Sequence, residues 1–122
     1  MTRGIRGATT VEHDNEDDIL NETKKLIIEM IDKNNVQAEN VSHAFISVTT
    51  DLTATFPAKS LRGLDGWAHV PVMCMQEIDV PNSLEKCIRI MMVVNTEEKQ
   101  SEVNHVFQNE AVKLRPDLVQ KE

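Results

Sequence analysis

The segment from Cys87 to Val94 constrains the fold of this chain more than any other part of the sequence. Its residues are apolar at both alternating sets of positions, and the one exception is Arg89. A strand of this kind belongs in the middle of a sheet, with cover on both faces. An arginine cannot lose its charge there, because its pKa stays above about 12, so its guanidinium needs an anion or several carbonyl oxygens as partners. The sequence leaves open whether the protein or a bound ligand supplies that partner.

Length and charge limit what the chain can be. The 122 residues are expected to form a single domain, residues 1–122, that folds around its own core without disulfides or metal. The net charge is −7, the basic residues are scattered, and the chain has one Trp and no Tyr to stack on bases. These features argue against binding to nucleic acid or to an anionic membrane. No segment approaches the roughly 20 apolar residues of a membrane span or resembles a secretory leader, so a cytoplasmic location is expected.

Signatures of nucleophilic, hydride-transfer or metal chemistry are absent from the sequence. Cys74 and Cys87 do not form a C-x-x-C pair, and Cys87 is expected to be a small core residue. The four histidines stand singly, without metal-ligand spacing, and are expected at the surface or its rim. Nucleotide-binding glycine loops and the G-x-S-x-G elbow are also missing. What remains is ligand binding, or catalysis by positioning and electrostatics without metal or cofactor.

The first half of the chain is predicted to contain a strand, a long helix and a second strand. Residues 3–10 end in β-forming residues and are interrupted by two glycines. Asn15 is placed to cap a helix whose apolar residues recur at helical spacing from Ile19 to Ile31, and Asn34-Asn35 can close it in a left-handed turn. The β-branched run at 43–50 predicts the second strand.

In the second half, residues 58–64 predict a short helix, and strands are expected at 72–77 and around Arg89. Ser101 is then expected to cap a last helix that ends before Pro116. The buried stripe of that helix would comprise Val103, Val106, Phe107 and Ala111. This order predicts an α+β fold in which a mixed sheet carries helices on one face.

Three charged residues are candidates for chemistry. Glu77 ends the third predicted strand, where an acidic residue most simply marks the point at which the strand reaches water. If the strands of Glu77 and Arg89 are neighbours, the two side chains form an internal ion pair, or else a fixed anion and cation directed into a cleft. The sequence does not separate these alternatives. Arg6, between Gly4 and Gly7, has a side chain that can bind a carboxylate with two parallel hydrogen bonds.

Blocks along nearly the whole chain resemble the bacillus-type monofunctional chorismate mutases. The resemblance runs from Arg3 to Leu118 in matching order. The matching blocks are Arg3–Thr10, Asp51–Leu52, Phe56–Lys59, Gly66–Trp67, Val70–Val72, Cys74–Glu77, Lys86–Arg89, Met91–Met92, Ala111–Val112 and Leu114–Leu118. The resemblance implies a pseudo-α/β-barrel homotrimer with active sites between subunits. It also implies the conversion of chorismate to prephenate in phenylalanine and tyrosine biosynthesis, without cofactor, metal or covalent intermediate.

Roles for individual residues follow from the resemblance. Arg89 would donate to the ether oxygen whose bond breaks and to a carboxylate. Glu77 would accept from the ring hydroxyl, and Arg6 would hold a carboxylate. Cys74 would support Glu77 and the hydroxyl. The remaining substrate-binding positions would be the backbone of Met73, Cys74, Met75 and Gln76, the neighbouring subunit's wall of Phe56, Ala58, Lys59 and Arg62, and Leu114 and Arg115 at the mouth, next to a mobile tail of about residues 116–122.

Two positions depart from the family pattern. Phe107 stands where the family has a tyrosine, so a hydroxyl contact to a carboxylate is lost while an apolar wall remains. Met73 replaces a smaller polar residue, which would crowd or dry the pocket. We therefore expect weaker substrate binding than in a family member that has the tyrosine.

The residues themselves leave two other functions open. One is a trimeric imine deaminase, which also clamps a carboxylate with an arginine between subunits. The other is a catalytically silent module that binds a carboxylate-bearing acid of the aromatic pathway.

Overall fold

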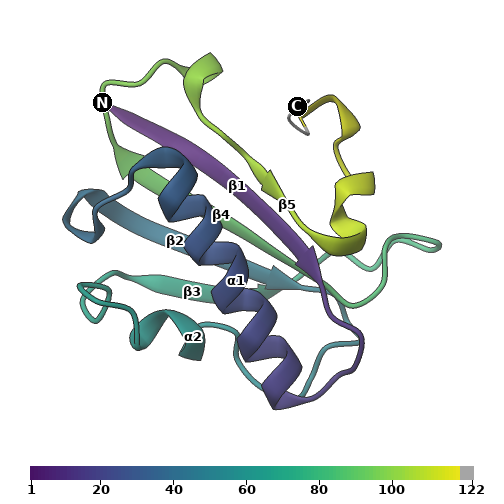
Figure 1. Cartoon of the computed structure of the whole chain (residues 1–122). Coiled ribbons are helices and arrows are strands. Elements are labelled where there is room, and N and C mark those ends of the chain that lie inside the picture. Colours follow the sequence, from purple (N-terminus) through teal and green to yellow (C-terminus); the bar gives the residue numbers. More distant parts are fainter. Residues whose placement is uncertain (119–122) are drawn as a thin grey trace.

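The computed structural model describes residues 1–118, and its centre is a five-stranded mixed sheet (Figure 1). The strand order is β3-β2-β4-β1-β5. Strand β4 lies in the middle and is antiparallel to β1 and β2, whereas the outer pairs β2–β3 and β1–β5 are parallel. The bounds are β1 Thr2–Thr10, β2 Val41–Val48, β3 Val72–Gln76, β4 Cys87–Asn95 and β5 Val106–Phe107. The mixed sheet and the central place of the Arg89 strand confirm the fold expected from the sequence.

One long helix covers one face of this sheet. Helix α1 spans Glu16–Asn34 and crosses the strands, as Figure 1 shows. The Asn15 side chain caps it by accepting from the Asp18 N–H at 2.8 Å, and Asn35 ends it in the left-handed conformation at φ 50°. Both caps are the predicted ones, and they work because each satisfies backbone groups that a helix end leaves unpaired. A second helix, α2, is a single turn at Lys59–Arg62 that packs against α1.

The hydrophobic core lies between α1 and one face of the sheet. Along β4 the alternate residues Ile88, Ile90, Met92 and Val94 are at most 4% exposed and face this core. Arg89 and Met91 face the other way and are exposed within the chain. The expectation that both faces of this strand are covered is therefore wrong for the isolated chain. The second face carries the exposed apolar side chains of Phe45, Met73, Met75 and Met91 beside charged residues, and among residues 1–118 no helix like α1 covers it.

The last helix predicted from the sequence is wrong. Residues 100–118 contain 3₁₀ turns at Gln100–Glu102, Asn109–Lys113 and Pro116–Leu118, with strand β5 between the first turn and the second. The spacing of Val103, Val106 and Phe107 imitates a helical stripe, but Val106 is buried while Phe107 projects toward the opposite face of the sheet. Asn109 adopts φ 53°, a left-handed conformation that interrupts any helix through this segment.

Gly7 is needed where β1 passes under α1. A Cβ at this position would collide with the Sδ atom of Met30 on the helix. The glycine thus allows the helix to approach β1 closely, which is the close backbone approach expected of a glycine within a strand. Arg6, its neighbour, projects to the opposite, open face of the sheet. Among residues 1–118, no helix has the length and apolar character required to cross a membrane.

Candidate active site

A cavity of about 270 Å³ lies on the open face of the sheet, opposite α1. All five strands or the turns that follow them contribute to its lining, together with the C-terminal segment. The lining residues are Arg6, Gly7, Ala8, Phe45, Ser47, Met75, Glu77, Arg89, Ile90, Met91, Phe107 and Arg115. The structure thus brings Arg6, Glu77, Arg89, Met75, Phe107 and Arg115, all predicted from the sequence, into one site.

Arg89 and Glu77 form the charged centre of this cavity. The Nη1 atom of Arg89 donates to Oε2 of Glu77 at 3.3 Å, and the side chains are 49% and 27% exposed. The sequence interpretation considered their two strands as neighbours. In the structure they are not, because β2 lies between β3 and β4. Ser47 on β2 stands opposite Arg89 in the register and donates its hydroxyl to the same Glu77 oxygen at 2.9 Å. The serine and arginine together hold the carboxylate at the end of β3.

The arrangement leaves most of the Arg89 guanidinium available. A guanidinium has five N–H donors, and the structure of residues 1–118 gives Arg89 a single hydrogen bond, to Glu77. The ion pair is therefore partial, and both groups face the cavity. Of the alternatives that the sequence left open, the geometry corresponds to a fixed cation and anion directed into a cleft.

Arg6 and Arg115 place two further cations at one side of the cavity. The Arg6 backbone N–H donates to Nδ1 of His105 at 2.9 Å. Burial, followed by the positive charges of Arg6 and Arg115, lowers the pKa of His105 below its ordinary value. Arg115 itself is held by Asp117 through two hydrogen bonds of 3.1 and 2.8 Å, a charge-assisted pair that orients its guanidinium. His105 is thus half-buried beside the site rather than an isolated surface residue.

Several sequence-predicted site residues lie outside this cavity. Met73 is 61% exposed on the same open face, and Gln76 is exposed as well. Cys74 pairs in register with Ile46 and packs against the core on the helix side, so its side chain points away from Glu77. Leu114 borders a different cavity. The predicted mobility of the tail stays a prediction, since residues 116–118 form a 3₁₀ turn and residues 119–122 lie outside the described residues.

The predicted wall residues do not line the cavity of their own chain. Phe56 is 70% exposed, and Arg62 is exposed on α2. Lys59 pairs with Glu16 at 3.5 Å, and Ala58 is buried at the α2 end of the core. The loop before Phe56 is fixed by Asp14, whose carboxylate accepts from the backbone N–H groups of Thr53 and Ala54 at 3.0 and 3.1 Å.

The two cysteines differ in environment. Cys87 is 3% exposed, which confirms the predicted core position. Burial raises the pKa of its thiol to about 11, so the thiol is neutral and unreactive near pH 7. Cys74 is half-buried and unpaired. Within residues 1–118, no group of three or more His, Cys, Asp or Glu side chains is arranged to hold a metal ion.

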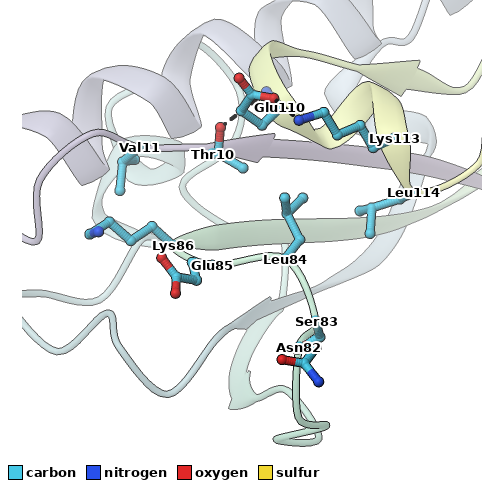
Figure 2. A pocket seen from close by; sticks show the side chains of 10 residues that line it. All are labelled: Thr10, Val11, Asn82, Ser83, Leu84, Glu85, Lys86, Glu110, Lys113 and Leu114. Carbon is cyan, nitrogen blue, oxygen red and sulfur yellow. Dashed lines mark hydrogen bonds and ion pairs between the residues drawn. The ribbon is translucent and has the colours of Figure 1, made fainter.

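A larger cavity, of about 690 Å³, lies where the end of β1 meets the β3–β4 loop and the 3₁₀ turn at 109–113 (Figure 2). Its side chains come from Thr10, Val11, Asn82, Ser83, Leu84, Glu85, Lys86, Glu110, Lys113 and Leu114. Figure 2 shows Lys113 turned toward Glu110, and the two form an ion pair of 2.6 Å. Its two acidic residues, Glu85 and Glu110, accompany its two lysines, Lys86 and Lys113, so it lacks the converging arginines of the Arg89 site.

Sequence reasoning did not assign to the site the lining residues Gly7, Ala8, Phe45, Ser47, Ile90 and Met91, nor His105 beside them. Phe45 and Ser47 alternate along β2 with the buried Ala44 and Ile46, so period-two alternation places them on the face away from the core. That signal was present in the sequence. Which strands flank β2, and therefore that Ser47 meets both Arg89 and Glu77, depends on strand order, which local sequence does not specify.

Comparison with known proteins agrees with this geometry. The family described as chorismate mutase type I matches residues 2–118. A chorismate mutase of Bacillus subtilis is 52% identical over 118 residues, covering 97% of this chain and 93% of the relative. A chorismate mutase of Thermus thermophilus is 43% identical over 119 residues, covering 97% of each.

The fold agrees as well. The solved structure of a chorismate mutase from Clostridium thermocellum superposes with a TM-score of 0.86 at 48% identity, covering 88% of this chain and 96% of the other. None of these matches favours an imine deaminase or a silent binding module. A family match over residues 2–118, two relatives at 52% and 43% identity and the same fold lead to one conclusion. This chain belongs to the type I chorismate mutases.

Proposed function

We propose that this chorismate mutase uses the Arg89–Glu77 cavity to rearrange chorismate to prephenate by positioning and electrostatic stabilisation. The reaction is an intramolecular isomerisation in which the ether C–O bond breaks while a C–C bond forms, so no atom enters or leaves. Neither proton transfer nor a nucleophile is required, and the lining residues include no histidine, cysteine or metal cluster among residues 1–118. The observation that supports the proposal is a guanidinium and a carboxylate 3.3 Å apart in one cleft.

Arg89 is proposed to stabilise the ether oxygen. As the C–O bond lengthens, negative charge accumulates on that oxygen, and a cation already held in place stabilises it more in the transition state than in the substrate. The Arg89 donors that Glu77 does not use are available for this contact. Removal of such a donor typically lowers kcat by about 10² to 10³.

Glu77 is proposed to face the ring. Ser47 and Arg89 both bond to its Oε2 atom, which leaves Oε1 available to accept from the ring hydroxyl. The carboxylate would then face the ring as the ring gains positive character while the ether bond breaks. The pair thus provides opposite charges for the two ends of a polarising substrate.

Arg6 and Arg115 are proposed to bind the substrate carboxylates. Both line the cavity, on the β1 side of Arg89. Local cations attract a dianion even though the chain carries a net charge of −7. Holding both carboxylates brings the flexible enolpyruvyl arm over the ring, which lowers the entropic part of the barrier. Phe107 would supply an apolar wall beside them.

The active site is proposed to be completed by a second copy of the chain in a homotrimer. Phe45, Met73, Met75 and Met91 are between 38% and 61% exposed on the open sheet face, and an apolar surface of this kind is typical of an interface. Phe56, Ala58, Lys59 and Arg62 lie away from their own cavity, so they could serve as the wall of a neighbouring site. The cytoplasmic location and the absence of a cofactor stay predictions. Support of Glu77 by Cys74 would have to come from the Cys74 backbone, because its side chain packs against the core.

The catalytic assignment is tested by following chorismate loss and prephenate formation in the wild type and in Arg89→Lys. The lysine retains the charge but loses the planar fork, so kcat should fall about 10²-fold or more. Arg3→Lys is the matched control, because Arg3 lies on β1 outside the cavity and binds the Glu98 carbonyl. Equal kcat values for Arg89→Lys and the wild type would contradict the role given to Arg89.

The shared site is tested by subunit mixing. Arg89→Ala impairs the cavity, and Arg62→Ala impairs the proposed wall. Refolding the two variants together creates trimers in which some sites combine an intact cavity with an intact wall. The mixture should therefore be more active than either variant alone, whereas mixing Arg89→Ala with Arg6→Ala, two cavity variants, should give no gain. A mixture of the first two without added activity would contradict the proposed sharing of the site.

A further inference from the structure

We propose that His105 is a positioning residue for the substrate carboxylate site, because its imidazole accepts the backbone N–H of Arg6 and thereby fixes the segment that carries the Arg6 guanidinium. The inference deepens the proposed function and rests on the carboxylate-binding role given there to Arg6. The bond joins the Arg6 N–H to His105 Nδ1 at 2.9 Å. It is a side-chain contact between segments 99 residues apart in the sequence.

The position of this bond in the sheet explains why a side chain is needed. Strand β5 has only two residues, and its register pairs Gly7 with Val106 and Ala8 with Phe107. The Gln108 N–H extends the contact by donating to the Ala8 carbonyl at 2.9 Å. Arg6 lies just before the paired residues, and its N–H points toward the β5 side, beyond the short backbone ladder. His105 supplies the acceptor that a longer β5 would have offered from its backbone.

The bond also defines the protonation state of the imidazole. Nδ1 can accept only when it carries no proton, so the neutral ring must hold its proton on Nε2. The charged groups facing His105 are Arg6 on β1 and Arg115 on the C-terminal segment, the latter paired with Asp117. From α1, Asn34 faces the preceding residue with an uncharged amide, which bonds the Asn104 backbone. The positive charges of Arg6 and Arg115 favour the neutral ring that the hydrogen bond requires.

The effect of losing this bond should fall on substrate binding. Arg6 is proposed to hold a carboxylate that does not take part in the bond changes. Such a contact is about as strong in the substrate complex as in the transition state. A displaced Arg6 should therefore raise KM while leaving kcat nearly unchanged. A general loss of folded enzyme would instead lower kcat per mole of protein and leave KM as it is.

The experiment compares His105→Leu with His105→Asn. Leucine removes the acceptor at similar volume, whereas the asparagine Oδ1 can occupy the place of Nδ1 and accept the same N–H. His105→Leu should raise KM about 5-fold with kcat within twofold of the wild type, and His105→Asn should restore KM to within twofold of the wild type. Equal KM values for His105→Leu and the wild type, or no rescue by asparagine, would overturn the proposal.

A double-mutant cycle with Arg6→Ala identifies the route of the effect. If His105 acts through Arg6, then His105→Leu should not raise KM further in the Arg6→Ala background. Full additivity would overturn the inference about His105 while leaving the proposed function intact. No change of KM in Arg6→Ala alone would instead show that the proposed role of Arg6 is wrong, and the inference would fall with it.

The wild-type protein provides a test that does not depend on the folding of a variant. Nuclear magnetic resonance can detect a scalar coupling across an N–H···N hydrogen bond. We expect such a coupling between the Arg6 amide nitrogen and His105 Nδ1, with the His105 proton on Nε2. A protonated Nδ1 at pH 7.5, or no coupling to Arg6, would overturn the proposal.

Discussion

Arg89 and Glu77 approach to 3.3 Å although strand β2 lies between the strands that carry them. The two side chains reach over β2, where the Ser47 hydroxyl provides a second contact to the Glu77 carboxylate. Because the arginine is 49% exposed, this pair adds little to the stability of the fold. The ion pair is therefore better explained by a role in the cavity than by a contribution to the stability of the fold.

Ser47→Ala should weaken catalysis without disturbing the sheet. The substitution leaves the Glu77 carboxylate with its contact to Arg89 alone, so the carboxylate becomes less well positioned. The loss of one hydrogen bond, about 1 kcal/mol, corresponds to a fall in kcat/KM of about 5-fold. Steady-state kinetics with chorismate measure the change. Ser42→Ala is the control on the same strand, since Ser42 is exposed and contacts His43 rather than the site. Similar losses in the two variants would contradict the specific role of Ser47.

Phe107→Tyr should lower KM for chorismate. Phe107 lines the cavity together with Arg6 and Arg115, and its ring is half-buried. A tyrosine would retain the apolar wall and add a hydroxyl that can donate to a substrate carboxylate, which we expect to lower KM about 5-fold. Phe45→Tyr is the control, because Phe45 lines the same cavity from β2, on the far side of Arg89 from β1. A KM for Phe107→Tyr that is unchanged or higher would contradict the explanation.

Local features of the sequence predicted the elements whose ends have strong caps. Asn15 and Asn35 bound α1 as expected because a cap acts on backbone groups only a few residues away. The resemblance, in turn, predicted the six site residues that the structure brings together. It did so because matching blocks such as Cys74–Glu77 and Lys86–Arg89 carry the site from distant parts of the chain.

Long-range pairing explains what could not be predicted. Strand order is decided by contacts across the whole chain, so the position of β2 between Glu77 and Arg89 has no local signal. The predicted last helix failed because Val106 and Phe107 join β1 in a sheet, and this pairing overrides a spacing that resembles a helix. Cys74 matched the family block, but its side chain follows the strand alternation toward the core.

The stability of the protein should depend on the protonation of His105. Burial and the charges of Arg6 and Arg115 lower its pKa in the folded chain below the unfolded value of 6.5. Below pH 6.5 the unfolded chain binds a proton that the folded chain does not, so the folded state loses stability as pH falls toward the folded pKa. His105→Asn does not titrate and should lose less stability over the same range. Melting temperatures measured between pH 7.5 and pH 5 test this. A constant difference between wild type and variant would contradict it.

Gly7→Ala should destabilise the fold, because the added methyl group collides with the Met30 side chain on α1. Met30 is fully buried, so it can move aside only by disturbing the core, at a cost of about 1–3 kcal/mol. Gly63→Ala is the matched control: no other atom lies within 4 Å of the added Cβ, and the backbone is already in the right-handed helical region at φ −84°. Denaturant unfolding at one protein concentration measures both variants.

Gly63→Ala should be neutral or slightly stabilising. Shortening Met30 to alanine in the Gly7→Ala background should remove the collision, so the effects of Gly7→Ala and Met30→Ala on the free energy of unfolding should not add. Equal unfolding midpoints for the two glycine variants would show that the approach of α1 to β1 does not require a glycine at position 7.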